Sequence, residues 1–395
     1  MGALSGLRVI DLSIVVQGPQ AGAMLHDLGA GVVKIELPGM GDMARWIFAE
    51  PEDDFSGFFE ACNRGKRSVT LDLRTPGGKR ALHRLLETAD VLLSNFVPGT
   101  MELWGLGYDE LATLYPRLVY ATASAFGPIG PDAGREGADL VAQAASGLIS
   151  TTGVDGHEPT PVGAAIADHS GSQNLVIGVL AALMHRHVSG AGQRVDVSLL
   201  GASIWAQASE YSYYLTSGRQ PKRSNRGHPL VRGALRMFPT ADGWIVLVGV
   251  PPHLWPGFGR ALERPDLAED DRFNSLFVKP EHLTELFDIL DGLFASRTTE
   301  EWTERLTAEK QRFGAVRNYS QVVADEQNWL NGYFVEGDHP TRGRVKVVGN
   351  PIRLSATPTV AGIVAPEIGQ HTEEVLLEVG FSWEDLDVLR AEGAW

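Results

Sequence analysis

The chain has 395 residues, of which 44% are hydrophobic and 21% are charged. This is the composition of a globular protein, and the length allows two or three domains. The formal net charge is −15, and no dense basic run occurs. A nucleic-acid partner is therefore disfavoured, because proteins that bind the phosphate backbone gather Lys and Arg on one face.

Cysteine usage and hydropathy indicate the cellular compartment in which the protein is expected. The single Cys62 excludes an internal disulfide framework and any multi-cysteine metal site, and it fits a reducing cytoplasm. The N-terminal stretch "MGALSGLRVIDL" lacks the charged and long apolar segments of a signal peptide. The longest apolar run, residues 175–184, is half of the roughly 20 residues that span a bilayer. We therefore expect a cytoplasmic protein with no membrane partner.

The first forty residues predict a strand, a loop, a helix and a second strand. Residues 7–12 and 31–36 are short apolar runs, and the helix between them has one apolar face, formed by Ala21, Met24, Leu25 and Leu28. Two such strands joined by a crossover helix form a βαβ unit. The pattern recurs, with strands at 67–73, 90–96, 118–126 and 193–200 and helices at 75–89, 139–150 and 173–187. We therefore predict an α/β fold with a doubly wound, Rossmann-like sheet.

The composition changes near Gly218, where a polar, basic and turn-rich stretch predicts a linker over residues 218–240. This leaves residues 1–217 as the large domain. A strand at 244–250 opens a smaller α+β domain at 241–325, with helices at 281–295 and 299–311. The remaining segment, 326–395, contains a hairpin-like stretch at 331–354 and amphipathic helices at 371–381 and 382–392.

Dinucleotide and metal sites are disfavoured by missing motifs. Glu36 ends the second strand, where an NAD enzyme keeps its ribose-binding acid. However, the first loop reads "QGPQAG" instead of G-x-G-x-x-G, and its Pro19 lacks a backbone donor for a pyrophosphate. No Walker loop, H-E-x-x-H or G-x-S-x-G motif occurs. His185 and His187 are two residues apart and face different sides of a helix.

A lone acid, Asp168, occurs in the small-residue stretch "PVGAAIADHSGS", directly before the predicted helix at 173–187. Asp168, Ser170 or Ser172 could cap that helix, which is the ordinary role of such residues. The small neighbours also allow another molecule to approach the carboxylate, and the N–H groups of the helix N-terminus should keep it ionised. Because an accessible carboxylate can act as a nucleophile or a base, capping and catalysis both stay open at this point.

Stretches in order along the chain resemble CoA-transferase family III, which also includes the α-methylacyl-CoA racemases. They include "GLRVIDLSIVVQGPQAGAMLHDLGAGVVKIELPGMGD", "NRGKRSVTLDLRTPGG", "PRLVYATASAFGPIGP", "PVGAAIADHSGS", "GQRVDVSLL" and "GNPIRLSATP". The resemblance implies an interlocked homodimer. In it, each chain has a large Rossmann-like domain, on which the C-terminal segment packs, and a small domain. Each active site then lies between the large domain of one subunit and the small domain of the other.

The resemblance also implies transfer of CoA from an acyl-CoA donor to a carboxylic acid acceptor, without a tightly bound cofactor. Asp168 matches the family nucleophile, which forms an acyl anhydride, an aspartyl-CoA thioester and a second anhydride in turn. The matching CoA-binding positions are Val16, Gln17, Leu71, Asp72, Leu73, Arg74, Asn95, Phe96, Arg135, Ala138 and Asp139. Arg74 could meet a CoA phosphate, whereas Asn95 and Phe96 could simply cap and pack a strand end.

Three positions depart from the family pattern. Leu37 and Leu103 stand where many members carry basic residues, so the CoA phosphates would need other partners, such as Lys66, Arg67 or Arg45. Ala138 falls where transferases often have Tyr and racemases need a His for proton transfer. Racemisation of a 2-methylacyl-CoA is therefore a disfavoured alternative, and a CoA-ester-binding protein without turnover is another. The small Ala138 side chain also favours an acid larger than formate or oxalate.

Overall fold

The computed structural model describes residues 2–47, 55–224, 226–231, 235–275, 278–360 and 362–395. The chain divides into two compact units. The first comprises Met1–Ser146, Val162–Gln207 and Asp325–Trp395, and the second comprises Gly147–Pro161 and Ala208–Ala324. Parts of the predicted linker (225, 232–234), of the predicted smaller domain (276–277) and of the last segment (361) lie outside the described residues.

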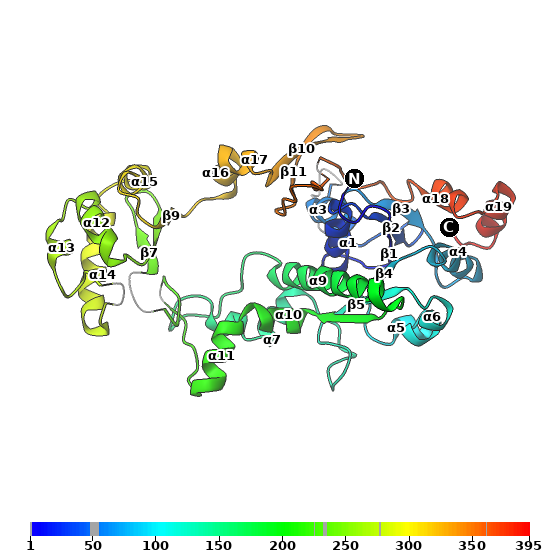
Figure 1. The fold of residues 1–395 in the computed structure, drawn as a ribbon, viewed down its shortest axis with the longest axis horizontal. Helices are drawn as coiled ribbons and strands as arrows, with labels where there is room; N and C mark the ends of the chain where they lie inside the picture. The colour runs from blue at the N-terminus through cyan, green and yellow to red at the C-terminus, as the bar shows by residue number, and fades with distance from the viewer. Residues whose placement is uncertain (1, 48–54, 225, 232–234, 276–277, 361) are drawn as a thin grey trace. The chain divides into compact units, whose positions relative to one another are not determined.

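The first unit is built on a six-stranded parallel sheet (Figure 1). Its strands are β1 (Arg8–Asp11), β2 (Gly31–Glu36), β3 (Arg67–Thr70), β4 (Val91–Ser94), β5 (Val119–Ser124) and β6 (Arg194–Ser198). Their order is β3-β2-β1-β4-β5-β6, and every neighbouring pair is parallel. The predicted α/β class with a parallel sheet is confirmed. The order in which strands are added to the sheet reverses between β1 and β4, and in doubly wound sheets ligands bind at such a point, beyond the carboxyl ends of the strands.

Two long helices cover one face of the sheet. α1 (Gln17–Asp27) and α9 (Ile166–Ser189) bury Leu25, Leu175 and Val179 against strand residues such as Val9 and Val119. Successive strand residues point to opposite faces, so Ile10, next to Val9, belongs to the cluster on the other side. Within the described part of the chain no helix, the 24-residue α9 included, is long and apolar enough to cross a membrane.

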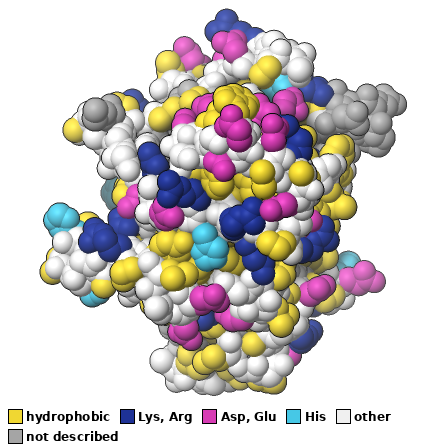
Figure 2. All heavy atoms as spheres, turned by 90° about the vertical axis from the view of Figure 1, so that its right-hand side faces the viewer, with side chains coloured by type: hydrophobic (Ala, Val, Ile, Leu, Met, Phe, Trp, Pro, Cys, Tyr) yellow, Lys and Arg dark blue, Asp and Glu magenta, His cyan; other side chains and the backbone are white. Residues whose placement is uncertain are grey.

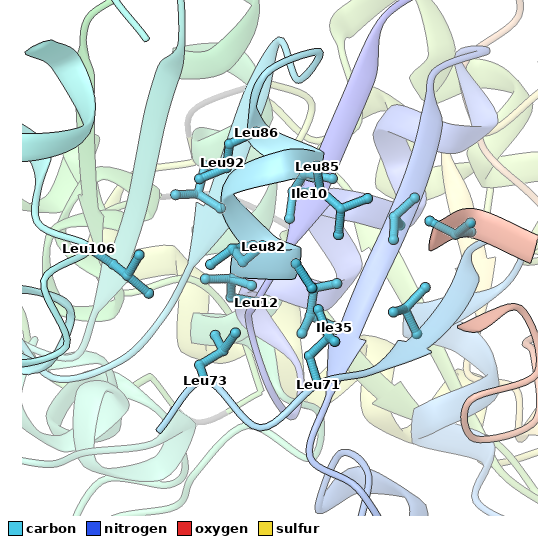
Figure 3. Close-up of a cluster of buried hydrophobic side chains, with 14 of the residues drawn as sticks. Ile10, Leu12, Ile35, Leu71, Leu73, Leu82, Leu85, Leu86, Leu92 and Leu106 are labelled. Carbon is cyan, nitrogen blue, oxygen red and sulfur yellow. The ribbon is translucent and has the colours of Figure 1, made fainter. Parts of the chain in front are cut away.

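The other face carries a larger apolar cluster (Figure 3). α4 (Pro76–Leu86) begins with Pro at its first position and is capped by Thr75, whose side chain accepts a hydrogen bond from the Gly78 amide. Its leucines, including Leu82 and Leu85, pack on the sheet side chains, and each fully buried one contributes about 1.5–3 kcal/mol. The C-terminal helices α18 (Thr372–Glu378) and α19 (Trp383–Ala391) add Val375, Leu376, Leu386 and Leu389 to this cluster.

The outer surface around α4, α18 and α19 mixes charges of both signs (Figure 2). Arg67 pairs with Glu374 and Glu378, and Arg80 pairs with Glu392. These pairs join residues far apart in sequence, and they spread the positive charge of this face among carboxylates instead of gathering it.

Shorter elements complete the first unit. β10 (Phe334–His339) and β11 (Gly343–Val348) form an antiparallel hairpin, as predicted. The short helices are α2 (Ala44–Ile47), α3 (Gly57–Asn63), α5 (Thr100–Leu103), α6 (Tyr108–Leu114), α7 (Asp139–Ala145), α10 (Leu199–Ala206) and α17 (Glu326–Leu330).

The second unit combines a three-stranded antiparallel sheet with helices. Its strands are β7 (Leu235–Pro239), β8 (Trp244–Val248) and β9 (Phe313–Ala315), in that order. Its helices are α8 (Leu148–Thr151), α11 (Ala208–Ser217), a 3-10 turn (Pro252–Leu254), α12 (Trp255–Ala261), α13 (Asp266–Glu269), α14 (Pro280–Phe294), α15 (Thr299–Ala308) and α16 (Tyr319–Ala324). Aromatic side chains fill its core, among them Trp255, Phe258, Phe294 and Trp302.

Two predicted helices have wrong bounds. The stretch at 139–150 forms α7 and α8 instead of one helix, because Gly147 adopts a left-handed φ of 76° between them. The helix predicted at 173–187 begins seven residues earlier, at Ile166. The second difference changes the interpretation of Asp168, because this residue lies inside the helix.

Candidate active site

Asp168 is the third residue of α9, so it does not cap the helix. The cap position belongs to Ala165, which makes no side-chain capping bond. Capping by Asp168, Ser170 or Ser172 is therefore wrong. Asp139, the first residue of α7, takes that role from another helix: its Oδ1 accepts hydrogen bonds from the amides of Ala167 at 2.7 Å and of Asp168 at 3.2 Å. The carboxylate of Asp168 is thus not required for helix capping.

The electrostatic surroundings of Asp168 oppose ionisation. Among the described residues, its carboxylate oxygens have no hydrogen-bond or ion-pair partner. Burial, together with the negative charge of Asp139, raises the pKa of Asp168 to about 7. The N–H groups of the helix N-terminus do not lower the pKa of Asp168 as the sequence led us to expect, because Asp139 occupies these first-turn amides. Groups whose pKa is shifted toward neutrality in this way are candidates for catalysis.

Gln17 lies beside the first turns of α9. The Ser172 hydroxyl lies 2.7 Å from the Gln17 carbonyl oxygen and 2.8 Å from the Asp168 carbonyl oxygen, which ties the start of α1 to the start of α9. Gly171 permits this approach, because a Cβ at this position would overlap the Gln17 side chain. Gln17 is 4% exposed, and its Nε2 has no partner in the described part of the chain. A buried amide donor is thus left unpaired near Asp168.

A cavity of about 300 Å³ opens at the carboxyl ends of β1, β2, β3 and β4. Five of the predicted CoA-binding residues line it: Leu71, Asp72, Leu73, Arg74 and Phe96. Leu37, which departs from the family pattern, also lines it, and the lining residues that the sequence did not predict include Leu12, Ile14, Met40, Met43 and Trp104. Their position after strand ends was the available signal, because doubly wound sheets bind ligands at that edge.

The charged side chains around this cavity are paired within the chain. Arg74 is exposed and makes two hydrogen bonds to the Asp72 carboxylate, at 2.8 and 2.7 Å, which hold the pKa of Asp72 below its usual value. The alternative phosphate ligands do not fit. Lys66 is buried on Asp11, Arg45 pairs with Glu36, and Arg67 pairs with Glu374 and Glu378. Of these cations, Arg74 is the one that combines exposure with a place at the cavity.

The remaining predicted CoA-binding positions are Val16, Asn95, Ala138 and Arg135. Val16 is buried, and it precedes Gln17 at the start of α1. The Asn95 side chain pairs with both backbone groups of Ile14, at 2.8 and 2.7 Å, so it fixes the loop that joins the cavity to Val16. Ala138 is exposed at the start of α7, next to Asp139. Arg135 is exposed and pairs with Asp132.

Glu36 cannot serve as a ribose acceptor in this structure. Its two carboxylate oxygens accept hydrogen bonds from Ser68 at 2.6 Å, from Arg45 at 2.9 and 2.8 Å and from the Asp42 amide at 2.8 Å. This disfavours a dinucleotide site further. Among the described residues, no group of three or more His, Cys, Asp or Glu side chains could hold a metal ion.

Comparison with known proteins identifies the family of this chain. CoA-transferase family III matches residues 4–372. The chain is 34% identical to a succinate–glutarate CoA-transferase of Agrobacterium fabrum, over 95% of each chain. It is 32% identical to a formyl-CoA:oxalate CoA-transferase of Streptomyces coelicolor, over 99% of this chain and 98% of that one. The structure of a CAIB/BAIF family protein from Brucella suis matches with a TM-score of 0.85 at 30% identity, over 96% and 99% of the two chains. The protein therefore belongs to CoA-transferase family III.

Proposed function

We propose that the enzyme transfers CoA from an acyl-CoA to a free carboxylic acid, with Asp168 as the covalent nucleophile. The observation that carries this proposal is the state of the Asp168 carboxylate. It has no partner among the described residues, its pKa is raised to about 7, and it lies on the helix turn that Gln17 contacts. A carboxylate that stabilises nothing in the fold and is partly desolvated is suited to attack a carbonyl carbon.

The reaction balances without an external energy source. A carboxylate oxygen of Asp168 attacks the thioester carbonyl, the C–S bond breaks, and CoA thiolate leaves an acyl-aspartyl anhydride. The thiolate then attacks the aspartyl carbonyl, which releases the donor acid and forms an aspartyl-CoA thioester. The acceptor carboxylate attacks this thioester, the C–S bond breaks, and CoA thiolate leaves a second anhydride between Asp168 and the acceptor acid. Attack of the thiolate on the acceptor acyl carbon yields the new acyl-CoA and restores the Asp168 carboxylate.

Two neighbours support Asp168 in this scheme. The unpaired Nε2 of Gln17 would donate a hydrogen bond to the oxyanion that forms during each attack, a contribution worth about 10²–10³ in rate for one such donor. Asp139 holds the first turn of α9 and raises the pKa of the nucleophile. A carboxylate with a higher pKa is the stronger nucleophile once it is ionised.

The cavity at the sheet edge would take part of the CoA molecule. Its lining is mostly apolar, and Arg74 at its edge offers a guanidinium to a phosphate group. In the proposed reaction CoA enters and leaves as part of the substrates.

Family membership alone does not give the identity of the acids. The relatives named above share similar identity with this chain, yet one is named for succinate and glutarate and the other for formyl-CoA and oxalate. Ala138, exposed beside Asp139, leaves room next to the nucleophile. We therefore propose an acid larger than formate or oxalate. A proton-transfer role is not available to a methyl group, so this position also argues against racemisation.

The enzyme would work as a homodimer, interlocked as in its family. An apolar stripe on α9 supports this proposal, because Ile177, Met184 and Val188 are 64%, 67% and 85% exposed and lie on one helical face. A second chain would cover such a stripe. The cytoplasm is the proposed compartment, because the chain has a single cysteine, Cys62, and therefore no internal disulfide.

The test is a transfer assay with Asp168→Asn and Asp168→Ala. Acyl-CoA donors of increasing chain length are combined with pooled carboxylic acids, and new acyl-CoA products are identified by mass spectrometry. Both variants should lose several orders of magnitude in kcat, whereas Asp109→Asn, which alters a first-turn acid of α6, should behave as wild type. Near-normal transfer by Asp168→Asn would refute the proposal. Deuterium exchange at the α-carbon of a 2-methylacyl-CoA at enzymatic rates would instead favour a racemase.

A further inference from the structure

Val15, in the loop between β1 and α1, has an unfavourable backbone conformation. Its φ is +70°, in the left-handed region that β-branched residues avoid. The other non-glycine residues with positive φ in the described part of the chain are Arg226, Glu263 and Lys310, none of which is β-branched. A conformation of this kind persists only where the surrounding contacts enforce it, and it is found most often at functional sites.

A buried ion pair enforces it. The Val15 amide donates to both oxygens of the Asp42 carboxylate, at 2.9 and 3.2 Å. Asp42 forms an ion pair with Lys34 at 2.8 Å, and neither side chain is exposed at all. Lys34 Nζ also donates to the Ser13 carbonyl at 2.8 Å. The pair therefore holds the loop on both sides of its strained residue.

The strained loop leads directly to the candidate active site. Val16 and Gln17 follow Val15 without an intervening residue, and Gln17 packs on Gly171 of α9. The Ser172 hydroxyl then connects the Gln17 carbonyl to the Asp168 turn. A rotation of the Val15 backbone to an ordinary φ would redirect the chain at Val16, and the Gln17 amide would turn with it.

The need for an ion pair here is not explained by stability. A buried pair is often matched or exceeded in stability by apolar residues of similar volume, because both charges lose their hydration. What apolar residues cannot supply is an acceptor for the Val15 amide and a donor for the Ser13 carbonyl at the same place.

We propose that Lys34 and Asp42 are positioning residues, which hold Val15 in its left-handed conformation and thereby aim the Gln17 amide at the reaction centre beside Asp168. The effect on the reaction rests on the proposed function. The conformation of the loop is a property of the free enzyme, and it can be measured without substrate.

The test replaces the pair by apolar residues, in Lys34→Met/Asp42→Leu. Hydrogen–deuterium exchange of the peptide that contains Val15 and Gln17 should become faster, and kcat should fall by about 10–100-fold, more than KM rises. Adding Val15→Gly should restore part of kcat, because glycine adopts a positive φ without strain. The control is Arg64→Met/Asp27→Leu, which removes another largely buried ion pair of the same unit and should leave kcat unchanged.

Each outcome decides the proposal. Unchanged exchange in the Val15 peptide overturns it, whether or not the enzyme transfers CoA. Faster exchange with wild-type kcat also overturns it, because release of the loop would then have no consequence for the reaction. Equal loss of kcat with and without Val15→Gly would indicate a merely structural role. If the wild-type enzyme transfers no CoA, the proposed function fails, and the exchange measurement still decides the holding of the loop.

Discussion

Asp139 accepts a hydrogen bond from the backbone amide of Asp168 while its negative charge raises the pKa of the Asp168 carboxyl. One acid thus has two effects on another. It fixes the helix turn that carries Asp168, and it takes up the amide donors that would otherwise have lowered the pKa of Asp168.

The first prediction is a pH dependence set by this pair. Nucleophilic attack requires the ionised form of Asp168, whose pKa is about 7, so kcat/KM should rise with pH up to about 7 and then level. Asp139→Asn removes a negative charge but retains an oxygen that can accept the amide hydrogen bonds. The pKa of Asp168 should therefore fall, and the midpoint of the profile should move to lower pH.

The measurement is kcat/KM from pH 5 to 9 for both enzymes, with an acceptor acid that stays ionised throughout. This quantity reports ionisation in the free enzyme. The Asp139 charge has no such effect if the midpoint does not move or if it moves to higher pH in Asp139→Asn.

The second prediction concerns Gly171, where activity and stability should separate. Alanine is favoured over glycine within a helix by about 1 kcal/mol, and Gly171 lies in α9. A Cβ at this position would overlap the Gln17 side chain and displace its amide. Gly171→Ala should therefore lose about tenfold or more in kcat without a matching loss in the free energy of unfolding.

Gly292→Ala in α14 serves as the control, because a Cβ there meets no atom within 4 Å among the described residues. It should leave kcat unchanged. Full activity in Gly171→Ala would show that the position of the Gln17 amide is not important for the reaction.

The third prediction assigns Arg74 to CoA binding. Its guanidinium is 69% exposed at the edge of the apolar cavity. Arg74→Gln should raise KM for the acyl-CoA by about 5–20-fold, since a charge-assisted phosphate contact is worth about 1–2 kcal/mol at an exposed site, and kcat should change little. Arg80→Gln removes an exposed, ion-paired arginine of α4 that does not line the cavity. Arg80→Gln should therefore leave this KM unchanged. If Arg74→Gln also shows the KM of the wild type, the phosphates bind elsewhere.

The fold was more predictable than the site. The alternation of short apolar strands with amphipathic helices predicted the parallel sheet, because inner strands such as β4 bury both faces and a covering helix buries one. The start of α9 was missed because the side chain that accepts its first-turn amide hydrogen bonds belongs to Asp139, which lies 28 positions before Ala167. The raised pKa of Asp168 follows from its burial in the folded chain and from the charge of Asp139, and neither has a local sequence signature.

One signal of the Lys34–Asp42 ion pair that holds the Val15 loop was present in the sequence. Lys34 lies between apolar residues of a strand that was predicted to be buried, and a buried lysine needs a partner. The partner could not be identified, because Asp42 lies beyond the strand in a loop whose path is set by the pairing of Glu36 with Arg45.

The fourth prediction is that the enzyme is a dimer that depends on the exposed face of α9. Ile177→Asp and Val188→Asp place charges on the apolar stripe and should weaken or abolish association, with loss of activity, because the site is proposed to need a second chain. His185→Asp changes a polar exposed residue of the same helix and should be tolerated. Sedimentation velocity of wild type and variants checks this. A folded, active wild-type monomer would contradict the dimeric account.

The most direct test of the account is to trap the acylated enzyme. Wild-type protein is incubated with an acyl-CoA donor that supports transfer, treated with hydroxylamine, digested and analysed by mass spectrometry. We expect a hydroxamate on Asp168 that requires the acyl-CoA, that is absent from Asp168→Asn and that does not appear on Asp139. An enzyme that turns over the same donor but carries no modification on Asp168, or carries it on another residue, would contradict the central claim.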